Sequence, residues 1–355
     1  MSTVPTVYDV AERSGVSIAT VSRVYRTPES VRLQTRMRVL EAARELGYVP
    51  SGNARGLASR STGVLGLCFP DYSDPDAEHE VGDDEDDVAM LYSDQIIRGM
   101  ERAARRHGYA LLIAASLKGG PESLVAKVAG RVDGFAVLAE TVSTEELEAA
   151  SRHQPVVVLA GPGEDGQLDH LDHIAVANRD GQRELTRHLI EDHGLRRLAF
   201  VGGDKISPDA QARFHGYREA CAAAGIVVGD EPDLRADPMT QAEGARAAEE
   251  LLDRGGQPPQ AMVFANDQMA VGALHTLERR GVRVPEDVVV TGFDGLPLGR
   301  LVRPALTTVR QPMRSLGEQA VELLVRRLSG GQAESPRSLV LPVTVVCRES
   351  CGCSR

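Results

Sequence analysis

Residues 6–26 read Thr-Val-Tyr-Asp-Val-Ala-Glu-Arg-Ser-Gly-Val-Ser-Ile-Ala-Thr-Val-Ser-Arg-Val-Tyr-Arg, and this stretch decides the fold of the N-terminal part of the chain. It predicts two short helices separated by Gly15. Thr6 and Asp9 have the spacing of a capping box, in which each side chain satisfies a backbone amide at the start of a helix. Gly15 suits the corner between the helices, because glycine tolerates the backbone of a tight turn. The pattern indicates a helix-turn-helix whose second helix has the length that fits a DNA major groove.

The second helix of this motif has one apolar face and one outer face. Ser17 is expected to cap it, and Val21 and Val24 are expected to pack inward. The outer face carries the side chains that would reach a base edge: Ile18, Ala19, Ser22 and Arg23. A purely structural helix pair is the alternative interpretation of the same pattern.

Three signals in succession resemble the lactose-repressor (LacI/GalR) family of bacterial transcription regulators. The first is the helix-turn-helix itself, with Asp9-Val10-Ala11, Gly15-Val16-Ser17 and Thr20-Val21-Ser22-Arg23-Val24. The second is a further predicted helix over Gln34–Tyr48, followed by Pro50. The third is Ala54-Arg55-Gly56-Leu57, which is similar to that family's hinge helix.

The resemblance implies a set of residues that contact DNA. They are Thr6, Ser17, Ile18, Ala19, Thr20, Ser22, Arg23, Arg26, Ala54, Arg55 and Leu57. Arg23 is expected to read a guanine, because arginine makes bidentate contacts with that base. Leu57 is expected to wedge into the minor groove at the centre of the operator. Gly56 lowers helix propensity by about 1 kcal/mol relative to alanine, so the hinge is expected to form only on DNA.

The formal net charge of −11 is unevenly distributed along the 355 residues. Residues 1–60 hold nine Arg and five Asp or Glu, so they carry about +4 and leave about −15 for the rest. A basic head on an acidic body favours DNA contact through the head alone. The five cysteines do not have the pattern of a disulfide scaffold. No signal peptide or long apolar span is evident, so we expect a soluble, cytoplasmic protein without a membrane partner.

After Ser61, short apolar runs alternate with amphipathic segments, a pattern typical of parallel sheets covered by helices on both faces. The apolar runs are Val64–Phe69, Ala110–Ala115, Gly134–Ala139, Val156–Ala160, His173–Ala177, Leu198–Gly202, Met262–Ala265 and Val288–Thr291. With the later runs this makes about ten strands, too many for one doubly wound domain. The sequence therefore predicts two lobes, before and after about residue 178.

The resemblance implies an α/β fold with an N-terminal helix-turn-helix DNA-binding head and a two-lobed, periplasmic-binding-protein-like core with parallel sheets. We expect the head at 1–49, the hinge at 50–61 and the core at 62–355. In such a core the chain crosses between the lobes three times. On this basis Leu306–Gln311 is expected to return to the first lobe and Leu339–Val346 to pass through the second. A ligand would lie in the cleft, outside the carboxyl ends of strands.

The resemblance also implies candidate residues for binding a small-molecule effector. They are Tyr92, Asn178, Asp180, Arg213, Asn266, Asp294 and Gln311. Arg213 and Asp294 are expected to hold the ligand, because a guanidinium and a carboxylate suit a polar molecule with both acceptor and donor groups. Plainer interpretations stay open for single residues: Asn266 could cap a helix, and Asp294 could start a turn.

The sequence departs from the family pattern at Asp76–Leu91, an insertion that contains Asp83-Asp84-Glu85-Asp86-Asp87. It has little to bury, so we expect a solvated loop at the mouth of the cleft. It lacks the spacing of ligands and glycine in a calcium loop. Its negative charge favours neutral or cationic effectors over anionic ones.

Three other patterns are weighed and set aside, so no cofactor and no metal are predicted. Gly161–Gly166 spells G-x-G-x-x-G, but a strand-like segment follows where a dinucleotide site needs a helix. Asp169–His173 is expected to be an exposed loop. Cys347–Cys353 lacks a paired C-x-x-C elsewhere in the chain. No nucleophile elbow or P-loop occurs.

These observations predict a DNA-binding transcription regulator that is not an enzyme. It is expected to be an effector-responsive repressor that binds a pseudo-palindromic operator as a homodimer. No heptad repeat follows the last predicted strand, so no tetramerisation segment is expected. Two alternatives stay open: a small-molecule-binding protein or enzyme on the same core, and a regulator without a small-molecule effector.

Overall fold

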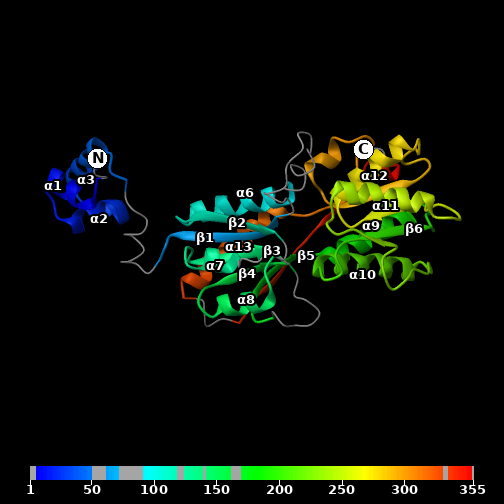
Figure 1. The fold of residues 1–355 in the computed structure, drawn as a ribbon, viewed down its shortest axis with the longest axis horizontal. Coiled ribbons are helices and arrows are strands. Elements are labelled where there is room, and N and C mark those ends of the chain that lie inside the picture. The colour runs from blue at the N-terminus through cyan, green and yellow to red at the C-terminus, as the bar shows by residue number, and fades with distance from the viewer. Residues whose placement is uncertain are drawn as a thin grey trace. The chain divides into compact units, whose positions relative to one another are not determined.

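The computed structural model describes residues 5–49, 61–71, 91–117, 124–138, 141–160, 169–330 and 335–353. They belong to two compact units, Met1–Thr62 and Gly63–Arg355 (Figure 1). The predicted hinge residues Ala54, Arg55 and Leu57, the loop 161–166 and all of the acidic insertion except Leu91 lie outside the described residues. No helix in the described ranges is long and apolar enough to cross a membrane.

The described residues of the first unit form three α-helices, α1 (Val7–Ser14), α2 (Ile18–Arg26) and α3 (Leu33–Leu46), with a short 3-10 helix at Pro28–Ser30. The Asp9 carboxylate accepts hydrogen bonds from the hydroxyl (2.7 Å) and the amide (2.6 Å) of Thr6, and these bonds lower the pKa of Asp9. Gly15 ends α1 with φ +63°. The Ser17 hydroxyl accepts from the Thr20 amide (3.2 Å) at the start of α2. The predicted helix-turn-helix and its caps are confirmed.

A small apolar core holds these helices together. Val10 of α1, Val21 and Val24 of α2 and Val39 of α3 are buried in it, as the inward face predicted for α2 requires. An ion pair between Arg13 and Glu45 (2.7 Å) links α1 to α3 at the surface.

The second unit contains two six-stranded sheets. The first sheet has the order β11-β5-β4-β3-β1-β2, and all its neighbouring strands are parallel. Its strands are β1 (Val64–Asp71), β2 (Ala110–Leu117), β3 (Gly134–Leu138), β4 (Val156–Leu159), β5 (Asp172–Val176) and β11 (Ser338–Leu341). The strands β4 and β5 are buried along their whole length, as expected for a sheet covered on both faces.

The second sheet has the order β12-β10-β9-β8-β6-β7. Its pairs are parallel except that β12 runs antiparallel to β10. Its strands are β6 (Leu198–Gly202), β7 (Leu234–Arg235), β8 (Ala261–Phe264), β9 (Val289–Asp294), β10 (Thr307–Arg310) and β12 (Thr344–Val346). The predicted core of parallel sheets is confirmed, with one antiparallel edge strand.

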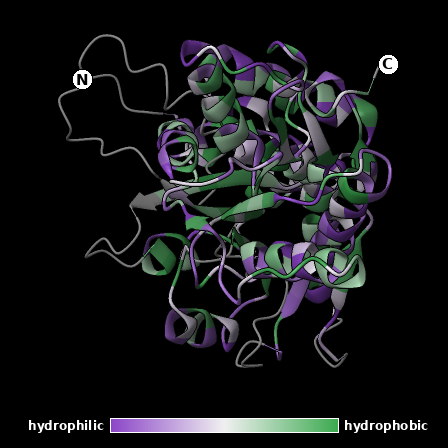
Figure 2. Ribbon diagram, turned by 90° about the vertical axis from the view of Figure 1, so that its right-hand side faces the viewer, coloured by the Kyte–Doolittle hydropathy of each residue, from purple (hydrophilic) through white to green (hydrophobic). Residues whose placement is uncertain are grey.

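Helices cover both sheets, which form the two lobes. In the first lobe, α6 (Leu91–Arg106) and α13 (Met313–Leu328) share one apolar cluster with the sheet, and α7 (Leu124–Ala129) and α8 (Thr144–Ser151) share another. In the second lobe, α9 (Asn178–Glu191) packs against α10 (Pro208–Ala223), and α11 (Gln241–Asp253) packs against α12 (Asp267–Arg279). Figure 2 shows largely hydrophobic strands between helices that carry both hydrophilic and hydrophobic residues.

The chain crosses between the two sheets three times, but two predicted segments lie elsewhere. Leu306–Gln311 does not return to the first lobe, because β10 pairs with β9 in the second sheet. The return is made by α13, which packs against α6. Leu339–Val346 is not a single pass through the second lobe, since β11 pairs with β5 in the first sheet and β12 with β10 in the second. The apolar residues continue from β11 into β12, so the sequence pattern does not indicate that the chain changes from one sheet to the other.

Glycine allows the paired helices to approach closely. A Cβ atom on Gly216 of α10 would overlap the Arg179 carbonyl group of α9. The other two helix pairs use glycines from both members: Gly99 with Gly317 between α6 and α13, and Gly244 with Gly272 between α11 and α12. These contacts are backbone against backbone, so side-chain rotation cannot relieve an added methyl group.

We expect Gly216→Ala to lower the free energy of unfolding by about 1–3 kcal/mol, because the methyl group forces α9 and α10 apart. Gly130→Ala is the matched control, because a Cβ there meets nothing within 4 Å. Urea unfolding of both variants measures the difference. Equal stability of the two variants would contradict the close contact between α9 and α10.

Candidate functional site

The outer face of α2 is the candidate DNA-reading surface. Ile18 is 40% exposed, and Ala19 and Arg23 are exposed beside it. Arg23 Nε donates to the Ala19 carbonyl oxygen (3.4 Å), a long bond that leaves the side chain at the surface. The first turn of α2 contains no acidic residue, so its amide groups and helix dipole face no competing carboxylate from that turn.

The other predicted DNA-contacting residues differ in burial and in whether their side chains are already hydrogen-bonded. The Ser17 and Thr20 hydroxyl groups bind each other (3.0 Å), and the Thr6 hydroxyl is bound to Asp9. Ser22 is half-buried. Arg26 is the last residue of α2, and its side chain lies outside the described part of the chain.

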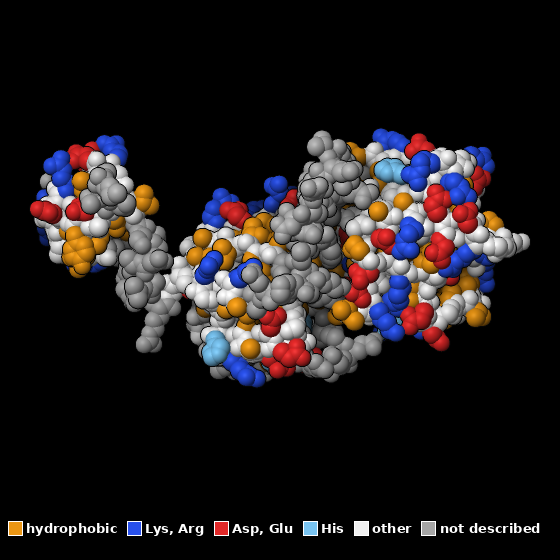
Figure 3. All heavy atoms as spheres, viewed as in Figure 1, with side chains coloured by type: hydrophobic (Ala, Val, Ile, Leu, Met, Phe, Trp, Pro, Cys, Tyr) orange, Lys and Arg blue, Asp and Glu red, His pale blue; other side chains and the backbone are white. Residues whose placement is uncertain are grey.

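The second lobe has no basic patch on the face that Figure 3 displays, where acidic and basic side chains are interspersed. Several of the charged groups of this lobe are paired, for example Arg280 with Asp253 (2.7 Å) and Arg283 with Asp287 (2.6 Å). A nucleic-acid-binding surface is expected to cluster positive charge on one face. This face therefore offers no site of that kind.

A cavity of about 160 Å³ lies between the two lobes of the second unit. The first lobe contributes a largely apolar wall of Pro70, Tyr92, Ser93, Leu138 and Leu159. The second lobe contributes a largely polar wall of Ser207, Asp209, Ala210, Arg213, Pro238, Met239, Thr240, Asn266, Gln268 and Asp294. A ligand in this cavity would contact both lobes.

Arg213, which α10 supplies, is the centre of the polar wall. It is only 5% exposed. Its Nε donates to Asn178 Oδ1 (2.9 Å) and its Nη1 donates to the Ala265 carbonyl oxygen (2.5 Å). Its guanidinium carbon lies 4.0 Å from the centre of the Phe293 ring. Nη2 has no partner among the described residues, so two donor protons remain for a ligand.

Asp294 lies opposite this guanidinium, with its Oδ1 3.5 Å from Arg213 Nη1. The same oxygen accepts a hydrogen bond from Gln311 Nε2 (2.6 Å). Burial raises the pKa of Asp294 to about 6, and Arg213 opposes the shift. Among the residues that the structure describes, Asp294 is the sole non-glycine residue with a positive φ, which is 123°. Strained backbone of this kind is concentrated at functional sites.

Asp267 is a second buried carboxyl group beside Asp294. Thr308 Oγ1 donates to its Oδ1 (2.5 Å), and the Leu296 amide donates to its Oδ2 (2.7 Å). Burial, and then the charge of Asp294, raises the pKa of Asp267. Asp267 is not among the residues that line the cavity, and its bond to the Leu296 amide holds the turn that follows β9.

The structure places four of the seven predicted effector residues in the cavity wall: Tyr92, Arg213, Asn266 and Asp294. Asn266 also caps α12, accepting from the Met269 amide (2.9 Å), so its plainer interpretation holds as well. Asn178 and Gln311 lie behind the wall, where they bind Arg213 and Asp294. Asp180 does not lie in the cavity wall, contrary to the prediction. It is exposed on α9 and forms an ion pair with Arg183 (2.7 Å). Asp180 follows Asn178 by two residues, about 200° around the helix axis, so its side chain points away from the cleft.

Several residues that line the cavity were not predicted from the sequence, notably Asp209, Met239, Thr240 and Gln268. Ser207 is the N-cap of α10 and Thr240 the N-cap of α11, so helix starts gather at this cavity. The capping positions were readable in the sequence, but their convergence on one cavity was not.

The two segments that the sequence analysis weighed as possible metal sites lie outside this cavity. Asp172 and His173 are not in an exposed loop: they start β5 and are buried, and Arg327 holds Asp172 through two bonds of 2.7 Å. Within the described ranges, one group of His and Cys side chains has the spacing of metal ligands, and it consists of His188, His193, Cys351 and Cys353. The sequence interpretation sought a second cysteine pair for the C-terminal cysteines and overlooked these histidines.

Two family descriptions match parts of the chain. Residues 6–51 match "Bacterial regulatory proteins, lacI family", and residues 186–351 match "Periplasmic binding protein-like domain". The chain is 32% identical over 350 residues to catabolite control protein A of Priestia megaterium, covering 97% of this chain and 98% of that protein. It is 31% identical over 344 residues to the HTH-type transcriptional repressor CytR of Escherichia coli strain K12, covering 95% and 94%.

Solved structures are similar over the same length. The Lac repressor dimer bound to operator and the anti-inducer ONPF matches with a TM-score of 0.80 and 28% identity, covering 98% of this chain and 99% of that one. The transcriptional regulator CelR in complex with cellobiose matches with a TM-score of 0.70 and 31% identity, with the same coverage.

We expect Arg213→Met to lower the free energy of unfolding by about 3–5 kcal/mol, because it leaves the Asp294 carboxylate buried without its cation. Asp294→Asn removes that charge, so the double variant should lose about 1–3 kcal/mol less than the sum of the single variants. Arg218→Met is the control, since Arg218 pairs with Asp230 at the surface. Urea unfolding at neutral pH measures all four; strict additivity would argue against a coupled pair.

Proposed function

Because this chain belongs to the LacI family of bacterial regulatory proteins, we propose that it is a transcriptional repressor whose affinity for its operator is controlled by a small molecule in the cleft. The observation that carries this proposal is the Arg213–Asp294 pair. A buried cation with two donor protons that have no partner among the described residues, and a strained, buried carboxylate, line one cavity between two lobes. Such a wall is costly to fold unless a ligand makes use of it.

The response would be carried by closure of the lobes. A ligand that contacts both walls of the cavity favours one arrangement of the lobes over another, and its differential affinity sets the size of the effect. In this proposal two copies of the chain form a homodimer, whose paired heads bind a pseudo-palindrome. Residues 50–61, with Ala54, Arg55 and Leu57, would be the hinge that orders on DNA.

The chemistry of the cavity favours a neutral or cationic, hydrogen-bonding effector. Asp209 and Asp294 bring two acidic groups to the wall against the single cation of Arg213. One wall is rich in hydrogen-bonding groups and the other is apolar, with the aromatic ring of Tyr92. A sugar-like molecule has hydroxyl groups for the first wall and C–H surfaces for the second. The relative solved with cellobiose supports a ligand of this class.

The proposal does not include catalysis. The described residues of the cavity wall include no histidine or cysteine, and the Asp294 carboxyl group is already engaged by Gln311 and Arg213. Binding without turnover, in the cytoplasm where the operator DNA lies, is the proposed role. A regulator without a small-molecule effector remains the competing proposal, and the cleft variants distinguish the two.

We expect Arg23→Ala to remove about 1–3 kcal/mol of base discrimination at one symmetric pair of operator positions, because a bidentate guanine contact is lost. Arg38→Ala, an exposed arginine on α3, is the control and should keep the preference. Operators selected from genomic fragments and tested with single-base changes give the measurement. Equal loss of affinity on all sequences would make Arg23 a phosphate contact instead.

We expect Asp294→Asn to weaken effector binding at least about tenfold, because it removes the charged acceptor while keeping the size of the side chain. Operator affinity without effector should stay within about twofold of the wild type, because head and cleft are separate units. Asp180→Asn is the matched control, since Asp180 lies outside the cavity.

Calorimetry against a panel of sugars, nucleosides and amines measures effector binding. An operator-binding assay without effector measures operator affinity. If Asp294→Asn binds and responds like the wild type, the cleft assignment fails. A regulator without a small-molecule effector then becomes the better interpretation.

A further inference from the structure

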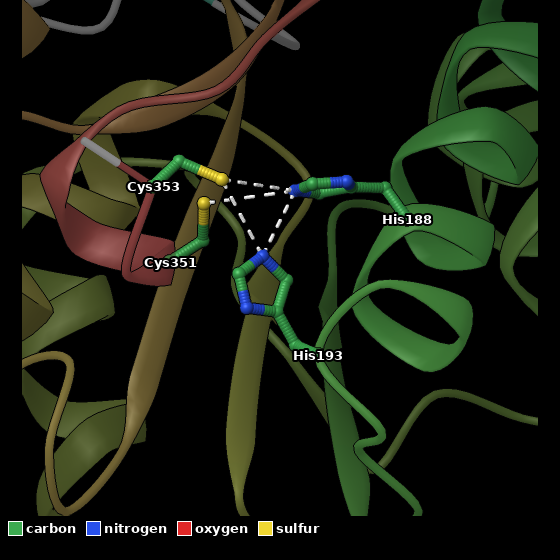
Figure 4. A group of neighbouring side chains, drawn as sticks. All are labelled: His188, His193, Cys351 and Cys353. Atoms are coloured by element: carbon green, nitrogen blue, oxygen red, sulfur yellow. Dashed lines mark hydrogen bonds between the residues drawn. The ribbon is translucent and has the colours of Figure 1, made fainter. Parts of the chain in front are cut away.

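Two histidines and two cysteines meet near the C-terminal end of the described chain (Figure 4). His188 comes from α9, and His193 from the turn that follows it. Cys351 ends the 3-10 helix η4 (Glu349–Cys351), and Cys353 follows that helix. One ligand atom from each side chain lies within 4.8 Å of all the others, and Figure 4 shows the four side chains directed at a common point.

The separations match those of a tetrahedral zinc site. Zinc–nitrogen bonds of about 2.0 Å and zinc–sulfur bonds of about 2.3 Å place two nitrogens about 3.3 Å apart and a nitrogen and a sulfur about 3.5 Å apart. The two histidine Nε2 atoms are 3.1 Å apart. His188 Nε2 lies 3.7 Å from Cys351 Sγ and 3.6 Å from Cys353 Sγ. His193 Nε2 lies 3.5 Å from Cys353 Sγ.

Hydrogen bonding alone does not account for this convergence. His188 Nδ1 lies 2.6 Å from the Asp192 carboxylate, so in the neutral ring Nδ1–H donates a hydrogen bond to that carboxylate and Nε2 keeps one lone pair. One lone pair accepts one good hydrogen bond, yet three sulfurs and a nitrogen lie within 3.7 Å of Nε2. A carboxylate behind the imidazole is the usual partner of a metal-bound histidine.

We propose that His188, His193, Cys351 and Cys353 form a structural zinc site that ties the C-terminal end of the second lobe to α9. Four protein ligands and no open position are typical of structural zinc. On binding, both thiols release their protons to solvent, including the Cys351 proton now directed at the Arg348 carbonyl oxygen (3.3 Å). Both imidazoles bind through neutral Nε2 atoms, so two thiolates balance the charge of Zn²⁺ and no electron is transferred.

The proposed site and the effector cleft lie at opposite ends of the strands of the second sheet. The Ser350 hydroxyl donates to the Val290 carbonyl oxygen (2.6 Å) and accepts from the Thr307 amide (2.8 Å), which holds η4 at the amino ends of β9 and β10. The cleft residue Asp294 is at the carboxyl end of β9. The zinc ion would therefore brace the lobe without touching the effector.

Metal content of the full-length chain, purified under reducing conditions, tests the proposal. We expect one zinc ion per chain in the wild type and at least about tenfold less in Cys351→Ser and Cys353→Ser. Cys347→Ser is the matched control: Cys347 lies 3.3 Å from His188 Nε2 but outside the group of four, so this variant should keep its zinc. A chelator should lower the melting temperature of the wild type and of Cys347→Ser, and leave that of Cys351→Ser unchanged.

Loading the wild type with cobalt(II) tests the site without a cysteine variant, which matters if such a variant folds poorly. Chelator-stripped wild type loaded with Co²⁺ should develop thiolate charge-transfer bands and the intense visible bands of a tetrahedral ion. The proposal is overturned if the reduced wild type binds neither Zn²⁺ nor Co²⁺, or if both cysteine variants retain the metal. Equal loss of zinc from Cys347→Ser, or a disulfide between Cys351 and Cys353 in the protein as extracted, also overturns it.

Discussion

Burial of the Arg213 guanidinium is the constraint on which the polar wall of the cleft depends. A cation with so little access to water is stable only if protein groups replace its hydration. Asn178 from α9, the Ala265 carbonyl at the end of β8 and Asp294 at the end of β9 supply those groups. One side chain from α10 thereby fixes the relative positions of a second helix and two strand ends.

The rest of the second lobe is arranged so that this contact can form. Arg213 reaches Asn178 only because α10 lies against α9, and Gly216 permits that approach at the level of the backbone. Gln311 and the turn after β9 hold Asp294 in its strained conformation. The wall from the first lobe is largely apolar in its described residues, whereas the wall from the second lobe is held by this polar network.

The helix α9 connects the cleft to the proposed zinc site. Its first residue, Asn178, binds Arg213, and His188 in its last turn belongs to the group of four metal ligands. The site would fix one end of this helix while the guanidinium fixes the other. Such bracing keeps the polar wall preorganised, which lowers the entropic cost of binding a ligand. The helices α6 and α13 pack closely in the same way in the first lobe.

The sequence by itself determined the local elements and the class of the fold. The capping box, the turn at Gly15 and the inward valines of α2 depend on neighbours within a few residues, so their pattern was sufficient. The alternating strands and helices predicted the parallel sheets for the same reason. The resemblance carried by residues 6–26 and 54–57 then predicted the regulator family.

The tertiary structure alone decided which residues meet. The pairing of β10 with β9, and the division of Leu339–Val346 between two sheets, depend on partners far away in the sequence. The resemblance placed both Asn178 and Asp180 in the cleft, but a step of two residues is about 200° around the helix and exposes Asp180 to solvent. His188 and Cys351 are 163 residues apart, so no spacing rule joins them. Periodicity reports which face of an element is buried, whereas a binding site is made by side chains from different elements whose convergence only packing determines.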